Sequence, residues 1–120
     1  MPKTILIGAP IDCGQKRAGC LMGPAAYRVA GIAHEVSAEG HGVEDWGDLT
    51  LPELRDVTCP NPVVHDLPET VGWAEILMDR VDDALSEGGF PIIMGGDHSL
   101  ALGSAAGAAA FAKRQGRPLF

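Results

Sequence analysis

Positively charged residues are scarce in this 120-residue sequence, and their scarcity excludes nucleic acid as an expected partner. Lysine and arginine number 9 together against 16 acidic residues, which leaves a formal net charge of −7. The basic residues are also scattered, and the adjacent ones are Lys16–Arg17 and Lys113–Arg114. Because phosphate groups and anionic lipid are bound by clustered lysine and arginine, neither nucleic acid nor an anionic membrane surface is expected to bind.

Long apolar runs are lacking as well. No stretch approaches the roughly 20 consecutive apolar residues that a membrane-spanning helix needs. The apolar run near the N-terminus, within MPKTILIGAP, is too short for a secretory signal. We therefore expect no membrane partner and a cytoplasmic location.

Cysteine is also rare, which argues against a disulfide framework. The three cysteines, Cys13, Cys20 and Cys59, are an odd number and form no Cys-x-x-Cys pair. This usage fits a reducing compartment, with small buried or half-buried thiols. A zinc site would need a tighter group of ligands than these positions offer.

What the sequence does contain is an alternation of strand-like and helix-like segments. Their bounds are 4–7, 43–49 and 90–94 for strands, and 24–36, 70–85 and 100–112 for helices, with 117–120 as the start of a fourth strand. Such alternation predicts an α/β fold with a parallel sheet. The acidic residues of the second strand suit an edge position. Prolines between Thr50 and Pro68 predict a surface excursion, and Thr70 is the expected cap of the second helix.

Two loops should carry function, because ligands of parallel sheets bind at the carboxyl ends of the strands. The first, 8–23, follows the first strand, and the second, Gly95–Ser99, reads Gly-Gly-Asp-His-Ser. Gly95 and Gly96 would let the backbone turn sharply and approach a ligand. Asp97 could orient or balance a cationic centre, Ser99 could cap the next helix, and a neutral His98 imidazole would suit a divalent metal. These residues alone leave His98 either structural or functional.

The motif resembles the arginase family of ureohydrolases. The matching segments are GAPIDCGQKRAGCLMGPAAYRVAGI at 8–32, DWGDL at 45–49 and GGDHSLALGS at 95–104, in the family's order. The resemblance implies a three-layer α/β/α fold around a parallel sheet. It also implies a binuclear manganese site that hydrolyses the guanidinium group of arginine to ornithine and urea, since metal-bound water yields hydroxide near neutral pH. Gly14–Gln15 followed by Gly19 resembles arginases more than agmatinases, which remain an alternative.

By the same resemblance, His98 is a manganese ligand, and Gly95, Gly96 and Asp97 support the metal site. The family's other ligands lie in an Asp-x-His-x-Asp and an Asp-x-Asp block that this sequence does not contain. We therefore interpret 1–120 as the amino-terminal part of one arginase-like domain, incomplete at its carboxyl end. We expect it to bind manganese weakly and to be inactive alone.

Further residues carry weaker expectations. Asp12, Lys16 and Arg17 lie in the loop that would face a small guanidino substrate such as arginine, whereas Arg28 should form a structural salt bridge. The third strand, Phe90–Met94, should have an open edge that invites pairing with another chain. A homo-oligomer, or association through that edge, is thus expected. The alternative function is a non-catalytic truncated module that acts through such association.

Overall fold

Three parallel strands form the centre of the molecule, whose described residues are 2–119 of a computed structural model. The strands are β1 (Thr4–Ala9), β2 (Val43–Asp48) and β3 (Phe90–Gly95), and their order in the sheet is β2-β1-β3. All of β1 is buried, which accounts for its apolar sequence. The acidic β2 lies at one edge, as predicted, and β3 lies at the other.

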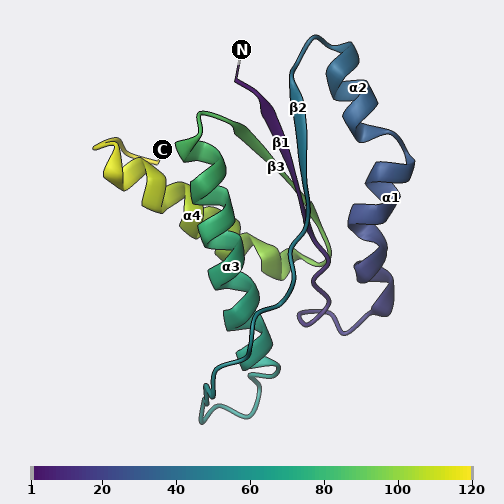
Figure 1. Cartoon of the computed structure of the whole chain (residues 1–120). Coiled ribbons are helices and arrows are strands. Elements are labelled where there is room, and N and C mark those ends of the chain that lie inside the picture. Colours follow the sequence, from purple (N-terminus) through teal and green to yellow (C-terminus); the bar gives the residue numbers. More distant parts are fainter. Residues whose placement is uncertain (1, 120) are drawn as a thin grey trace.

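Helices cover both faces of this sheet (Figure 1). One face carries α1 (Gly23–Val29) and α2 (Ile32–Ala38), and the opposite face carries α3 (Leu67–Ser86) and α4 (Ala101–Arg114). Short 3₁₀ helices, η1 (Ala18–Met22) and η2 (His98–Leu100), precede α1 and α4. The predicted three-layer α/β/α arrangement is confirmed. Among the described residues, no helix combines the length and apolar character that a bilayer crossing requires.

Two predicted helix boundaries are wrong. The single helix expected over 24–36 is two helices, because Gly31 adopts a φ of 89° in the left-handed region, where glycine is favoured and a helix is interrupted. The second predicted helix begins at Leu67 with Pro68 in its first turn, so Thr70 lies inside it instead of capping it. The excursion before it, 49–66, has no helix or strand and extends past the end of the sheet (Figure 1).

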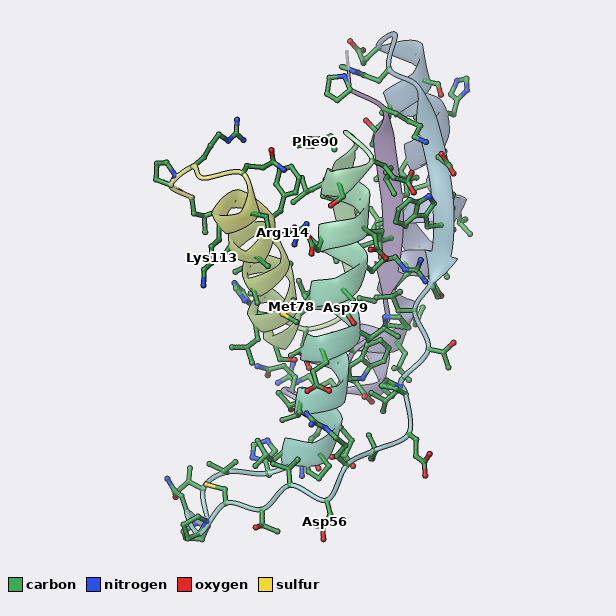
Figure 2. All side chains as sticks on the ribbon, turned by 60° about the vertical axis from the view of Figure 1, so that its left-hand side comes forward. Asp56, Met78, Asp79, Phe90, Lys113 and Arg114 are labelled. Atoms are coloured by element: carbon green, nitrogen blue, oxygen red, sulfur yellow. The ribbon has the colours of Figure 1, made fainter. Side chains whose placement is uncertain are left out.

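Helix α4 packs closely on α3, as its alanine-rich sequence predicts. Gly103 and Gly107 are buried against α3, and a Cβ at Gly107 would lie 2.6 Å from the carbonyl oxygen of Met78. Figure 2 shows Met78 on the side of α3 that faces α4. Glycine at these positions thus allows the two helix backbones to approach.

The predicted fourth strand is not found in the described part of its range. Residues 117–119 follow α4 without strand structure, and Phe120 lies outside the described residues. Strand β3 therefore has a neighbour on one side only within 2–119, and Phe90 at its start is 58% exposed. Figure 2 shows Phe90 at the end of the molecule where β3 begins.

Candidate functional site

The candidate site lies where β1 and β3 end side by side. Ala9, the last residue of β1, is in register with Gly95, the last residue of β3. Because the two strands are parallel, the chain segments that follow them leave the same edge of the sheet. The backbone N–H of Asp97 donates to the carbonyl oxygen of Ile11 at 2.9 Å, which joins the two segments just beyond the strands.

Glycines make this junction close. A Cβ at Gly96 would lie 2.4 Å from the Ile11 carbonyl oxygen, and one at Gly23 would lie 1.8 Å from the Gly95 carbonyl oxygen. Both contacts are with backbone, which cannot move aside as a flexible side chain can. The sequence predicts that Gly95 and Gly96 let the backbone approach a ligand. At Gly96 the structure shows that the backbone approaches the backbone of Ile11.

Asp97 is the buried polar residue of the site, with 6% of its surface exposed. Its Oδ2 accepts hydrogen bonds from the backbone N–H groups of Gly14 and Gln15, both at 2.9 Å. Its Oδ1 accepts from the Ser99 backbone N–H at 3.0 Å and from the Ser99 hydroxyl at 2.5 Å. Burial raises the pKa of Asp97, but these hydrogen bonds outweigh it and hold the pKa below its ordinary value.

The cap of η2 is therefore Asp97, and α4 has Leu100 at its N-cap, so the expectation that Ser99 caps the next helix is wrong. The side chain of Asp97 accepts from the Ser99 N–H, as an N-cap residue does. Ser99 contributes the donors instead. The reason is that Asp97 has the extended backbone that precedes a helix, whereas Ser99 already lies within η2.

His98 is exposed at the carboxyl end of β3. It lines a surface hollow of about 300 Å³ together with Gly95, Gly96, Asp97 and Tyr27, the last from α1. Its imidazole is therefore open to a ligand, and a position buried among apolar side chains is ruled out. Tyr27 was missed as a site residue from the sequence, where it reads as part of the apolar stripe of its helix.

The described residues do not fit a manganese ion by themselves. No group of three or more histidine, cysteine, aspartate or glutamate side chains in 2–119 is placed to hold a metal ion. Asp97, the carboxylate nearest to His98 in the chain, already accepts four hydrogen bonds. The region thus offers one available imidazole where a catalytic metal site needs several protein ligands.

The residues expected on the substrate side line a different hollow. Asp12 and Lys16 line a space of about 340 Å³ with Asp66 and Glu69 from the start of α3, and His98 is not among its lining residues. The ammonium group of Lys16 lies 3.3 Å from Asp66 Oδ2. Arg17 is exposed just before η1. The structure therefore places Asp12 and Lys16 together, but not in the hollow of His98.

Arg28 forms the structural ion pairs that its sequence position predicts. Its guanidinium donates to both carboxylate oxygens of Asp45 at 2.7 and 2.9 Å and to Asp48 Oδ1 at 2.5 Å. These hydrogen bonds raise the pKa of Arg28 and lower that of Asp45. Helix α1 is thereby attached to edge strand β2, at the same end of the sheet as the site.

Other candidate residues do not join the site. Free thiols are found at Cys13, which is buried, Cys20, which is partly buried, and Cys59, which is exposed. A larger hollow of about 510 Å³ lies between β2 and α3 and includes Trp46 and Arg80, with no residue of the Gly-Gly-Asp-His-Ser turn in its lining. This hollow shares no lining residue with the hollow of His98 and is separate from it.

Comparison with known proteins gives a consistent picture. The profile of the arginase family matches residues 2–119. The arginase of Brucella melitensis is 40% identical over 115 residues, which covers 96% of this chain and 37% of that protein. The chain thus spans a little over a third of this relative's length.

Solved structures of arginase-family proteins have a fold similar to that of this chain. The arginase of Bacillus caldovelox superposes with a TM-score of 0.79 at 34% identity, covering 92% of this chain and 37% of that one. A formiminoglutamase variant from Trypanosoma cruzi, whose structure was determined with manganese, superposes with a TM-score of 0.62 at 25% identity, covering 92% and 36%. The family profile, the curated relative and the shared fold lead to one conclusion: this chain belongs to the arginase family.

Proposed function

We propose that this chain contributes His98 to the manganese site of an arginase-like ureohydrolase, which hydrolyses the guanidinium group of arginine to ornithine and urea. The observation that carries the proposal is the exposed His98 imidazole at the carboxyl end of β3, in a chain matched by the arginase family over 2–119. We further propose that Gly95, Gly96 and Asp97 hold the turn that bears it, and that the protein acts in the cytosol.

In this proposal the chain supplies one ligand of the manganese site, His98. Residues 2–119 hold no cluster of three potential ligands, and a catalytic metal site needs at least that many. We expect the 120-residue chain to bind manganese weakly and to release no urea from arginine when tested alone. Isothermal titration calorimetry and a urea assay measure these two properties. Tight stoichiometric binding, or turnover by the pure chain, would contradict the inference that this chain supplies too few metal ligands.

A complementation experiment tests the positive part of the proposal. The chain is mixed with the segment of Bacillus caldovelox arginase that it does not match, and complex formation is checked by analytical ultracentrifugation. With manganese present, the complex should release urea from arginine. The complex made with His98→Ala should release at least about tenfold less, and His41→Ala serves as the matched control at a distant histidine. A stable but inactive wild-type complex would refute the proposal.

The substrate is proposed as arginine, with an agmatinase-like preference as the alternative. Asp12, Lys16 and Arg17 remain proposed substrate-side residues, and Asp12 and Lys16 face a hollow of their own. Urea release from arginine and from agmatine by the same complex separates the two substrates. Faster turnover of agmatine would favour the alternative.

A second candidate function is association without catalysis, favoured by the open edge of β3. Apolar hollows of about 340 and 370 Å³ flank this strand; Ile92 lines the first, Pro91 and Ile93 line the second, and Phe90 lines both. Unpaired backbone groups between two apolar surfaces are suited to an added strand. The occupant that we propose is β3 of a second copy. Sedimentation as a monomer at all concentrations would exclude it, and weaker self-association of Ile92→Lys would support it.

A further inference from the structure

Two segments far apart in the sequence meet at one carboxylate. Asp97 follows β3, whereas Gly14 and Gln15 belong to the loop after β1, 83 and 82 residues earlier. Oδ2 of Asp97 accepts both loop N–H groups, and Oδ1 accepts both donors of Ser99 in its own turn. One oxygen therefore holds the loop and the other holds the turn.

The fit around this carboxylate is close. A Cβ at Gly14 would lie 2.9 Å from Oδ1 and 3.0 Å from Oδ2 of Asp97, so the loop backbone passes directly over the carboxylate. With two donors on each oxygen, Asp97 has little capacity left to bind a metal or a substrate. Its effect on the site must be exerted through the groups that it holds.

We propose that Asp97 is a positioning residue that locks the loop bearing Asp12 and Lys16 to the turn bearing His98, so that the two move as one unit. The proposal rests on the proposed function, since it links the expected substrate side of the site to the expected metal ligand. It assigns the connection to a side chain, in addition to the backbone hydrogen bond between Asp97 and Ile11.

The substitution Asp97→Asn tests the link with little change in volume. An asparagine keeps one acceptor oxygen and replaces the other with an NH₂ group, which donates. If its oxygen faces Gly14 and Gln15, the NH₂ group opposes the Ser99 N–H. If the oxygen faces Ser99, the NH₂ group opposes both loop N–H groups. Either orientation leaves backbone donors facing a donor, so at least one side of the lock opens.

Hydrogen exchange followed by NMR measures the lock in the 120-residue chain without any metal. In Asp97→Asn we expect the Gly14 and Gln15 amides, or the Ser99 amide, to exchange about tenfold faster. The amide of Leu6 in the buried strand β1 should be unaffected, which separates local opening from general destabilisation. Ser99→Ala is the matched control, because it removes one hydroxyl donor and leaves the loop hydrogen bonds in place.

Gly14→Ala tests the same link from the loop side and keeps the proposal falsifiable if Asp97→Asn does not fold. The added methyl group would displace the loop, and we expect the backbone amide resonances of His98 and Ser99 to shift. Unchanged exchange in Asp97→Asn, or unchanged His98 and Ser99 resonances in folded Gly14→Ala, would overturn the inference.

A manganese titration of the wild-type chain keeps this result separate from the proposed function. Selective paramagnetic broadening of the His98 resonances is expected if His98 is a ligand. Its absence would count against the proposed function, while the exchange measurements would still decide whether Asp97 locks the loop to the turn.

Discussion

The two helical layers are attached to the same sheet by different kinds of interaction. Helix α3 buries Trp73, Leu77, Val81 and Ala84 toward the core, and α4 packs on it through Gly103 and Gly107. Helices α1 and α2 bury very little: Pro24 is the buried residue of α1, and α2 has none among its described residues. Val29 and Tyr27 of α1 are 90% and 52% exposed.

Polar contacts and close backbone approach take the place of apolar packing in the α1 and α2 layer. Arg28 joins α1 to β2, and Gly23 lies directly against the Gly95 backbone. Apolar burial stabilises through the total area removed from water, whereas an ion pair depends on two side chains and on pH. We therefore expect the two layers to respond differently to substitution and to acid.

The largest expected effect on stability is in the apolar layer, which α3 and α4 form. Gly107→Val would place a side chain 2.6 Å from the Met78 carbonyl oxygen and 2.9 Å from Val81 Cβ. Separating α3 from α4 should lower the free energy of unfolding by about 1–3 kcal/mol in urea denaturation. Ala109→Val, at an exposed position of the same helix, is the control for helix propensity. An equal loss in both variants would mean that close packing is not the cause.

A smaller effect on stability is expected in the polar layer, which α1 and α2 form. Arg28→Lys keeps the charge but cannot reproduce the paired hydrogen bonds to Asp45 together with the contact to Asp48, and should cost about 1 kcal/mol. The control is Arg55→Lys, which alters a more exposed pair with Glu75. Equal stability of Arg28→Lys and wild type would contradict the assigned role of this contact.

The same ion pair should give the polar layer a pH dependence. The pKa of Asp45 is lower in the folded protein than its ordinary value of 3.8, so its contribution to stability is present above that ordinary value. It is lost as the pH falls through the lower value of the folded state. The stability difference between wild type and Arg28→Lys should therefore shrink between about pH 5 and pH 2.

The smallest effect is expected for the polar contact within the apolar layer. Arg114 of α4 reaches Asp82 of α3, and Figure 2 shows Arg114 between these helices. Because the glycine contacts already hold the helices together, Asp82→Asn should leave the midpoint of urea denaturation unchanged within error. A loss as large as that of Arg28→Lys would remove the distinction between the two layers.

Much of the fold could be predicted because its signals are local. The apolar run of β1, the acidic β2 and the small residues of α4 each predict their own environment, and the structure confirms all three. Errors arose where several local signals compete. Thr70 is a good helix cap by itself, but Pro68 suits a first helical turn and α3 begins before both.

The candidate site was predicted less completely. Gly-Gly-Asp-His-Ser at a strand end located the turn and led to the exposed His98. The hydrogen bonds from Gly14 and Gln15 to Asp97 join positions 83 and 82 residues apart, and no local pattern reports such a pairing. The separate hollow of Asp12 and Lys16 likewise depends on where α3 begins in space.

By itself, the sequence determined the parallel α/β fold, the family resemblance and the turn that carries the histidine, because periodicity, glycine positions and motif order are properties of neighbouring residues. The tertiary structure alone decided that the Asp97 carboxylate is occupied by four hydrogen-bond donors while His98 stays exposed. A carboxylate accepts from whichever donors surround it, and here two of the four come from a loop that only the parallel pairing of β1 with β3 brings within reach.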